Sequence, residues 1–232
     1  MEDTMSNLYG IAAKTHSGHH VTKPLFYYQK YDDFLNHHRI FPETILEIGT
    51  FEGESTKILS AAFPGSKILS LDLHIRPIDF SACNNVTYQE ADQTNRNQLV
   101  SLITNHFPQG VDLVIEDASH YGFFSKLTFD IVFPLVKPRG AYFIEDWGTG
   151  YWDDWADGSR FQNFIQVPHN DMVPKRLHSH DFGMVGFVKS LVDLTHESAI
   201  KNTTKDTSKF SSRVEVLEFG EGVCMLLKSS TK

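Results

Sequence analysis

The stretch Ile45-Leu-Glu-Ile-Gly-Thr-Phe-Glu-Gly-Glu-Ser55 joins a short apolar run to a glycine-containing turn. Gly49 and Gly53 let the backbone turn tightly and approach a ligand before a helix begins near Ser55. Asp72 ends the next apolar run, about twenty residues on, where nucleotide-binding strand–helix–strand units place an acidic residue on ribose hydroxyls. Each residue alone could be a turn residue or a helix cap. In this order, they predict a nucleoside-binding α/β unit.

Further apolar runs alternate with segments that carry apolar residues at helical spacing, which predicts a mainly parallel sheet. We expect strands at 45–49, 67–73, 86–91, 111–116, 141–145, 213–219 and 223–228. We expect helices at 24–34, 55–63, 96–106, 123–136 and 183–196. Gly220-Glu-Gly222 joins the last two strands as a hairpin, so at least one strand is antiparallel. Breaks are predicted at Pro64-Gly65, Pro108-Gln-Gly110 and Lys137-Pro-Arg-Gly140, and a surface loop at 201–212.

Length and composition narrow the class of protein. With 232 residues, we expect one substantial core, with an N-terminal helical cap over 1–42 and a catalytic domain over 43–232. A net charge of −8 without a long Lys/Arg run argues against nucleic-acid and membrane partners. The polar N-terminus and the absence of a long apolar run predict a cytoplasmic protein. Cys83 and Cys224 are too few for a disulfide framework and are expected to be packing residues.

Two further acidic clusters follow predicted strands, Glu116-Asp-Ala-Ser-His120 and Glu145-Asp146. Carboxyl ends of neighbouring parallel strands meet at one edge of a sheet, so these loops should converge. Carboxylates close together repel one another unless a cation lies between them, and Mg²⁺ suits a few carboxylates. His120 could then accept a proton from a hydroxyl group. The alternative is that Asp117 and His120 only cap a helix and that Glu145-Asp146 is a solvated loop.

The glycine spacing favours S-adenosylmethionine over a nicotinamide dinucleotide as the ligand. Phe51 stands where the dinucleotide motif has its middle glycine, and it would crowd a pyrophosphate, which S-adenosylmethionine lacks. After the third strand, Asp92 and Gln93 could reach an adenine edge. The residues predicted to contact the cofactor are Glu47, Gly49, Thr50, Gly53, Ser55, Asp72, Asp92, Gln93 and Asp117.

At these residues the chain resembles class I S-adenosylmethionine-dependent methyltransferases, and within them the magnesium-dependent macrolide sugar O-methyltransferases and their cephalosporin-hydroxylase-like relatives. The matching blocks are 45–55, 112–120 and 133–146, with a weaker match in the last hairpin. The resemblance implies a Rossmann-like α/β fold, with a mainly parallel seven-stranded sheet, an antiparallel C-terminal strand and helices on both faces. It also implies that Asp117, Glu145 and Asp146 bind the metal and that His120 is the general base. Glu116 departs from the Asp that commonly precedes the metal-binding Asp.

An aromatic and acidic segment follows the last of these clusters. All three tryptophans lie between 147 and 155, at the start of a long connection over 147–180. Such loops are commonly functional, and this one could form a lid whose rings pack on an acceptor. The alternative is a hydrophobic plug or an oligomer contact. The residues predicted to contact the acceptor are Trp147, Tyr151, Trp152 and His180.

Together these features predict a Mg²⁺-assisted O-methyltransferase that acts on a hydroxyl of a sugar or polyhydroxylated natural product, a small-molecule acceptor. Three alternatives stay open: a catechol-type O-methyltransferase, a nonmethylating relative, and a noncatalytic S-adenosylmethionine-binding or assembly protein. The aromatic segment and the resemblance are also compatible with a homo-oligomer.

Overall fold

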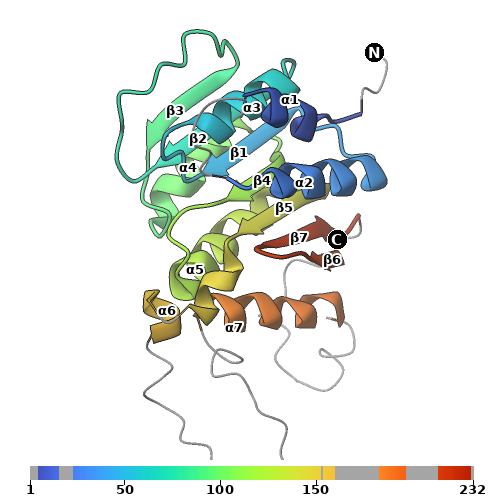
Figure 1. Ribbon diagram of the computed structural model, residues 1–232, viewed down its shortest axis with the longest axis vertical. Helices are drawn as coiled ribbons and strands as arrows, with labels where there is room; N and C mark the ends of the chain where they lie inside the picture. The colour runs from blue at the N-terminus through green and yellow to red at the C-terminus, as the bar shows by residue number, and fades with distance from the viewer. Residues whose placement is uncertain (1–4, 16–22, 153, 160–182, 197–213, 231–232) are drawn as a thin grey trace, which may run out of the picture.

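A seven-stranded sheet runs through the molecule in the order β3-β2-β1-β4-β5-β7-β6 (Figure 1). The computed structural model describes residues 5–15, 23–152, 154–159, 183–196 and 214–230. β7 runs antiparallel to both β5 and β6, whereas the other four pairs are parallel, so the predicted mixed sheet is confirmed. The strands are β1 (Thr44–Ile48), β2 (Lys67–Asp72), β3 (Val86–Glu90), β4 (Val111–Glu116), β5 (Val136–Glu145), β6 (Val214–Phe219) and β7 (Val223–Lys228).

The strand order reverses between β1 and β4. The chain moves outward from β1 to β3 and then returns to place β4 on the other side of β1. In open α/β sheets, ligands bind at the carboxyl ends of the strands beside such a reversal. Gly49 and Asp117 directly follow β1 and β4, so this position in the fold is occupied by two residues that the sequence predicts to be functional.

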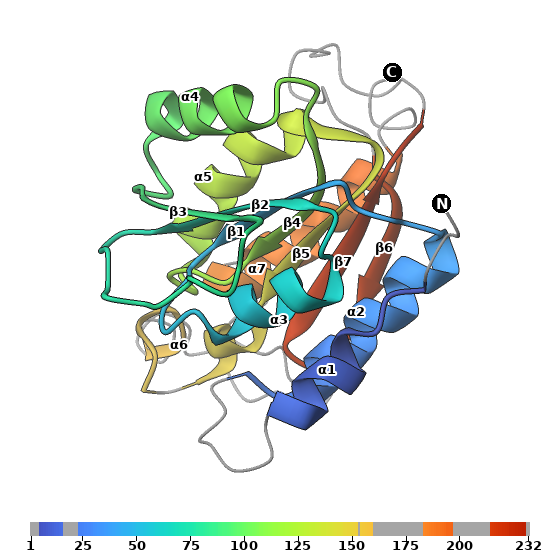
Figure 2. The same ribbon diagram turned by 90° about the horizontal axis from the view of Figure 1, so that it is seen from above.

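Helices cover both faces of the sheet (Figure 2). One layer contains α1 (Leu8–Thr15), α2 (Leu25–His38) and α3 (Glu54–Ala62). The opposite layer contains α4 (Arg96–His106), α5 (Gly122–Val132) and α7 (Gly183–Ser190). The shorter elements are the 3-10 turns η1 (Phe133–Leu135), η2 (Trp147–Tyr151) and η4 (Leu191–His196), together with α6 (Ala156–Ser159).

Successive strand residues pack into different layers. In β1, Ile45 is buried with α1, α2 and α3, whereas Leu46 and Ile48 are buried with α4, α5 and α7. The same alternation explains why the strands read as continuous apolar runs, since both faces of a parallel sheet are covered.

One predicted break is wrong. The sequence placed a loop at 137–140, but β5 begins at Val136 and continues through these residues. Its register against β4 shifts between the pairs Val111–Val136 and Leu113–Ala141, and Arg139 has a φ of 65°. The extra residues form an irregularity that accommodates Pro138 and Gly140 without ending the strand. The expected helix 123–136 is correspondingly shorter and ends as α5 followed by η1.

Helix α2 is fixed to both its neighbours. The buried Asp32 carboxylate accepts hydrogen bonds from the backbone N–H groups of Leu8 (2.8 Å) and Tyr9 (2.9 Å), which satisfies the N-terminus of α1. On the sheet side, the ring of Tyr31 stacks on Phe143 of β5, with 4.8 Å between centroids. These contacts hold α2 beside the end of β5.

Both cysteines are free thiols, and Cys224 is buried in the core. Within the described ranges, no helix is long and apolar enough to cross a membrane.

Candidate active site

The ends of β1 and β4 approach each other closely at Gly49. This residue has a φ of 101°, and a Cβ placed on it would lie 1.9 Å from the carbonyl oxygen of Asp117. Backbone hydrogen bonds join Gly49 to Leu71 (2.8 Å) and Asp117 to Ile48 (2.8 Å). Only glycine fits here, both because of the left-handed backbone and because no side chain has room.

Asp72 holds the glycine-containing turn in place. Its Oδ2 accepts hydrogen bonds from the backbone N–H groups of Thr50 (3.0 Å) and Phe51 (2.8 Å). The sequence predicted a ribose contact for this carboxylate, and the structure adds a role within the protein. The turn leaves Phe51 half exposed at a φ of 48°, with the guanidinium carbon of Arg76 4.4 Å from the ring centroid.

Two pockets lie on either side of the reversal in strand order. The first, here called the cofactor-side pocket, has a volume of about 340 Å³, and its lining includes Gly49, Asp72, Asp92, Gln93, Ala118 and Phe124. The second, the metal-side pocket, has a volume of about 270 Å³, and its lining includes Lys23, Tyr27, Gly49, Asp117, Ala118, His120, Glu145 and Asp146. The two pockets meet at Gly49 and Ala118, which line both.

Several residues predicted to bind the cofactor do not line the cofactor-side pocket, and their contacts with a cofactor stay predictions. Glu47 is fully buried beside α3, where its Oε2 accepts hydrogen bonds from Thr56 and from Ser70 (2.9 Å). Burial raises the pKa of the Glu47 carboxyl, although Lys23 opposes this shift. Thr50, Ser55 and Asp117 line the metal-side pocket rather than the cofactor-side pocket, and Gly53 lines neither of the two.

Asp92 and Gln93 line the cofactor-side pocket, but both make contacts within the protein. Asp92 accepts a hydrogen bond from the backbone N–H of Thr94 (2.8 Å), two residues on, whereas the helix cap of α4 is Asn95. The Gln93 amide donates to Thr128 (2.9 Å) and to Glu116 (3.3 Å). Their roles toward a cofactor stay predictions.

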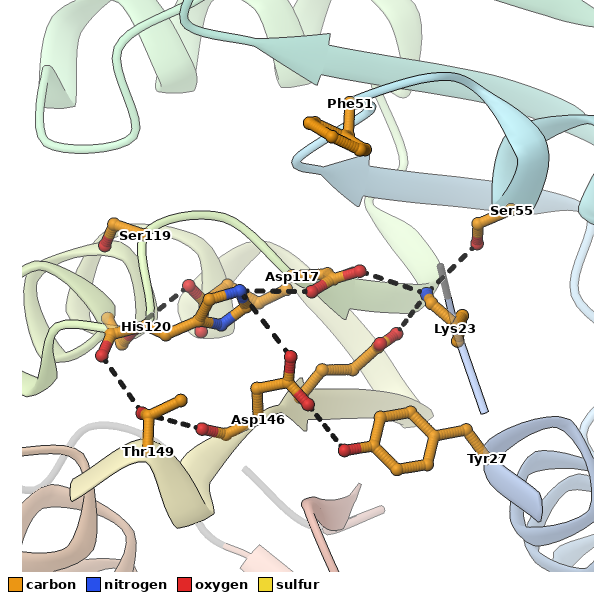
Figure 3. A network of polar contacts seen from close by, with 12 residues as sticks. Lys23, Tyr27, Phe51, Ser55, Asp117, Ser119, His120, Asp146 and Thr149 are labelled. Atoms are coloured by element: carbon orange, nitrogen blue, oxygen red, sulfur yellow. Dashed lines mark hydrogen bonds and ion pairs between the residues drawn. The ribbon is translucent and has the colours of Figure 1, made fainter. Parts of the chain in front are cut away.

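The loops after β4 and β5 converge, as the sequence predicted, and bring Asp117, His120 and Asp146 together (Figure 3). The Nε2 atom of His120 lies 3.6 Å from Oδ1 of Asp117 and 3.7 Å from Oδ2 of Asp146. One ligand atom from each residue falls within 4.8 Å of the others, which is a spacing that could hold a metal ion. We call these three residues the acid–histidine cluster. His120 and Asp146 have φ values of 53° and 51°, and such backbone strain is concentrated at functional sites.

The aromatic segment fixes the backbone of His120. Its carbonyl oxygen accepts hydrogen bonds from the indole N–H of Trp155 (3.1 Å) and from the hydroxyl of Thr149 (3.3 Å). Sequence reasoning noted Trp155 as part of an aromatic segment but did not assign it this contact. Nothing in the spacing of the tryptophans indicated which of them would reach the histidine.

Sequence reasoning missed Lys23 entirely. Its side chain is 5% exposed, and its Nζ donates to Glu145 (2.6 Å), with Asp117 and Ser55 each 3.2 Å away. Burial alone would lower the pKa of Lys23, but the neighbouring Glu145 and Asp117 carboxylates raise it well above its ordinary value, so the ammonium stays charged. The only hint in the sequence is a basic residue before the predicted helix 24–34.

Glu145, predicted as the third metal ligand, lies outside the acid–histidine cluster. Its side chain is 1% exposed, and its Oε1 accepts hydrogen bonds from both Lys23 and the hydroxyl of Tyr31. A buried carboxylate needs such partners because desolvation disfavours its charge. The structure therefore pairs Glu145 with a cation of the protein itself.

Tyr27 is a second residue, after Lys23, that the N-terminal segment brings to this site. Its hydroxyl donates to Oδ1 of Asp146 at 2.5 Å, which leaves Oδ2 of the same carboxylate on the side of His120. Burial raises the pKa of Tyr27, and the hydrogen bond to Asp146 raises it further, so the phenol stays protonated as the donor.

The residues predicted to contact an acceptor are spread around this site. The Trp147 indole donates to the carbonyl oxygen of Gly220 (3.1 Å), and its ring packs near Phe219 of β6. Tyr151 and Trp152 are 40% and 53% exposed, and neither lines the two pockets. His180 lies outside the described residues, as do most of the predicted loop over 147–180 and the predicted loop at 201–212. The acceptor contacts of all four stay predictions.

Sequence comparison relates the chain to O-methyltransferases of natural-product pathways. It is 29% identical over 175 residues to demethylmacrocin O-methyltransferase of Streptomyces fradiae, covering 72% of this chain and 39% of that protein. It is 30% identical over 131 residues to mycinamicin VI 2''-O-methyltransferase of Micromonospora griseorubida, covering 53% of this chain and 31% of that protein. The chain therefore spans less than half the length of these relatives. No family model matches it.

Comparison with solved structures identifies methyltransferases that share the fold of this chain. The MycE methyltransferase of the mycinamycin pathway, solved with Mg and SAH, superposes with a TM-score of 0.73 at 21% identity, covering 98% of this chain and 55% of that one. A caffeoyl-CoA O-methyltransferase-like protein from Staphylococcus aureus superposes with a TM-score of 0.52 at 16% identity, covering 97% of this chain and 93% of that one. The chain has the class I methyltransferase fold, and both sequence relatives are named as O-methyltransferases.

Proposed function

We propose that this chain transfers the methyl group of S-adenosylmethionine to a hydroxyl of a sugar or polyhydroxylated natural product, with the help of Mg²⁺. The observation that carries the proposal is that the metal-side pocket, with its acid–histidine cluster, adjoins the cofactor-side pocket at Gly49 and Ala118. A methyl donor in one pocket and a hydroxyl in the other would face each other across these two residues. Positioning of this kind can supply several kcal/mol of a transfer barrier.

The names of the relatives support a sugar hydroxyl over a catechol as the acceptor. Besides the two proteins above, the chain resembles 8-demethyl-8-alpha-L-rhamnosyl tetracenomycin-C 2'-O-methyltransferase of Streptomyces olivaceus, with 31% identity over 108 residues. It also resembles L-olivosyl-oleandolide 3-O-methyltransferase of Streptomyces antibioticus, with 27% identity over 137 residues. These last two names place the methyl group on a glycosylated compound, which favours a glycosylated acceptor.

The donor set fits a magnesium ion. Asp117 and Asp146 would hold it, since hard carboxylate oxygens are the ligands that Mg²⁺ prefers. In formal charges, Asp117, Glu145 and Asp146 contribute −3 and Lys23 contributes +1, so the group carries −2, which one divalent cation would neutralise. When bound, Mg²⁺ would make a nearby acceptor hydroxyl more acidic.

His120 is the group that would remove the acceptor proton. Its Nε2 faces the oxygens of both aspartates, and its backbone is fixed by the hydrogen bonds from Trp155 and Thr149. Nε2 would accept the hydroxyl proton as the oxygen bonds to the methyl carbon and the carbon–sulfur bond breaks, leaving S-adenosylhomocysteine.

Calorimetric titration with S-adenosylhomocysteine, with and without Mg²⁺ and with NAD as the control ligand, tests the cofactor class first. We expect binding of S-adenosylhomocysteine and not of NAD. Glycosylated polyols and catechols are then offered as acceptors, and mass spectrometry detects the gain of one methyl group. Binding without methylation of any acceptor would favour the noncatalytic alternative, and failure to bind S-adenosylhomocysteine would contradict the proposal.

The metal is tested separately with Asp117→Asn and Asp146→Asn. We expect each change to abolish the dependence of turnover on Mg²⁺, because each removes a charged oxygen ligand. A metal titration that is unchanged in both variants would defeat the proposed metal site.

The proposal also includes a cytoplasmic location and a homo-oligomeric state. It includes no nucleic-acid or membrane partner, and it divides the chain into a cap over 1–42 and a catalytic domain over 43–232. Light scattering of the purified chain measures the oligomeric state directly.

A further inference from the structure

The two aspartates of the acid–histidine cluster are held in the same manner. Asp117 has Oδ2 3.2 Å from Nζ of Lys23 and Oδ1 3.6 Å from Nε2 of His120. Asp146 has Oδ1 2.5 Å from the hydroxyl of Tyr27 and Oδ2 3.7 Å from Nε2 of His120. In each carboxylate, therefore, one oxygen contacts the N-terminal segment and the other is left on the side of the histidine. Figure 3 shows Lys23 and Tyr27 approaching from the side opposite to His120.

Tyr27 reaches Asp146 only because the neighbouring hairpin leaves room for it. Gly222, in the turn between β6 and β7, has a φ of 71°, and a Cβ placed there would lie 1.9 Å from the Tyr27 hydroxyl oxygen and 2.7 Å from its ring carbon Cζ. The Tyr27 side chain is 4% exposed. Helix α2, the β6–β7 turn and the loop after β5 thus fix the position of one hydroxyl.

We propose that Tyr27 is a positioning residue of the metal site, which sets the orientation of Asp146 so that Oδ2 faces the cation. The inference rests on the metal site proposed above and extends it to the N-terminal segment, which sequence reasoning treated as a cap. Groups that orient metal ligands through hydrogen bonds typically change metal affinity by about 10–100-fold when they are removed.

Helix α2 provides a matched control one turn further on. The Tyr31 hydroxyl also donates to a carboxylate, but that carboxylate is Glu145, which lies outside the acid–histidine cluster. Tyr27→Phe and Tyr31→Phe therefore make the same chemical change in the same helix, and only the first removes a contact from a cluster residue.

The two substitutions should have opposite effects on the unfolding midpoint and on the acid–histidine cluster. Asp146 is 38% exposed, so water can replace the lost hydroxyl and Tyr27→Phe should change the unfolding midpoint little while loosening the carboxylate. Glu145 is 1% exposed, so Tyr31→Phe should lower the unfolding midpoint while leaving the cluster intact.

The experiment titrates the metal-free 232-residue chain with Mn²⁺ and measures the free ion by its electron paramagnetic resonance signal. We expect Tyr27→Phe to weaken Mn²⁺ binding about ten-fold. Binding of S-adenosylhomocysteine should be unchanged, and Tyr31→Phe should bind Mn²⁺ like the unmodified chain. Gly222→Ala, which displaces Tyr27 without touching the cluster, should weaken Mn²⁺ binding in the same direction.

Three results would overturn the inference. Unaltered Mn²⁺ affinity in Tyr27→Phe, when the unmodified chain binds the ion, would remove the positioning role and leave the proposed function standing. An equal loss in Tyr31→Phe would show a general effect of α2 rather than the orientation of Asp146. Failure of the unmodified chain to bind Mn²⁺ would overturn the metal site and this inference together.

Discussion

The cofactor-side and metal-side pockets meet at Gly49 and Ala118, yet they are built in different ways. The cofactor side is formed mainly by loops that directly follow parallel strands, and Asp72 in its lining accepts a hydrogen bond from Phe51, 21 positions earlier in the chain. On the metal side, the contacts of Lys23 with Glu145 and of Tyr27 with Asp146 span 122 and 119 positions. We call the two pockets the two halves of the site. The cofactor-side half is fixed by local backbone geometry, whereas the metal-side half depends on how the N-terminal segment packs.

If the two halves are separable, a change on the metal side should leave the cofactor side intact. The largest effect is expected from His120→Ala, which removes the proposed base. Turnover should fall by about 10²–10⁴-fold, the usual contribution of a general base. The Kd for S-adenosylhomocysteine, measured by calorimetry, should stay the same. His37→Ala, in an exposed part of α2, is the matched control. Full activity in His120→Ala would remove the base assignment.

Lys23→Met tests how strongly the metal side depends on the N-terminal segment. It leaves the buried Glu145 carboxylate without its cation, so we expect the free energy of unfolding to fall by about 3–5 kcal/mol in urea titrations. Lys126→Met is the control, since it breaks an exposed pair with Asp130 in α5 and should cost less than about 0.5 kcal/mol.

The double variant Lys23→Met/Glu145→Gln sharpens this result. Removing the uncompensated charge should recover much of the lost stability. A cost for Lys23→Met no larger than that for Lys126→Met would mean that the pair with Glu145 does not fix the segment.

A third test compares two buried carboxylates at the ends of neighbouring strands. Glu145 has Lys23 as a partner, whereas among the described residues Glu116 accepts hydrogen bonds from the neutral groups of Ser125 (3.1 Å) and Gln93 (3.3 Å). Burial raises the pKa of Glu145 well above its ordinary value although Lys23 opposes the shift, and it raises the pKa of Glu116 from 4.5 to about 7. Between these values the unfolded chain has lost the proton that the folded chain retains, so stability falls as pH rises and levels off above the folded-state pKa.

Glu116→Gln should remove this dependence. Relative to the unmodified chain, the variant should gain stability between about pH 5 and about pH 8, by an amount on the order of 3 kcal/mol. Urea titrations in the presence of a chelator measure the difference at each pH. A difference that does not change across this range would contradict the raised pKa.

The smallest effect is expected on the cofactor side itself. Asp72→Ala removes the acceptor of the Thr50 and Phe51 N–H groups and should weaken S-adenosylhomocysteine binding about ten-fold, or about 1.4 kcal/mol. Mn²⁺ affinity should be unchanged, the reverse of the result for Tyr27→Phe. Asp79→Ala, in an exposed turn where the carboxylate bonds only to Ser81 among the described residues, is the control. Loss of both ligands in Asp72→Ala would show that the two halves are not separable.

The sequence predicted the strands well because each is a short apolar run closed by a turn. The predicted strands at 111–116 and 223–228 have the bounds found in the structure. It failed at 137–140, where Pro138 and Gly140 are usual signs of a loop, because pairing with β4 continues past an irregular register. Local signals cannot show whether a neighbouring strand will tolerate an irregularity.

The candidate site was also predicted in part. Asp117, His120 and Asp146 follow strands, and parallel strands present their carboxyl ends at one edge, so their convergence follows from order along the chain. Glu145 is the last residue of β5 and meets Lys23 and Tyr31, whereas Asp146 lies just beyond the strand with a left-handed backbone (φ 51°). Which of the two reaches the cluster depends on what lies on each side of the sheet.

The sequence by itself thus determined the strand segments, the glycine-containing turn after the first of them, and the edge where acidic residues gather, because these depend on short-range patterns. Only the tertiary structure decided that Lys23 pairs with Glu145, that Tyr27 holds Asp146 and that Trp155 holds His120. Contacts of this kind depend on how α2 and the aromatic segment pack, and packing is settled by the whole core rather than by the residues that make the contact.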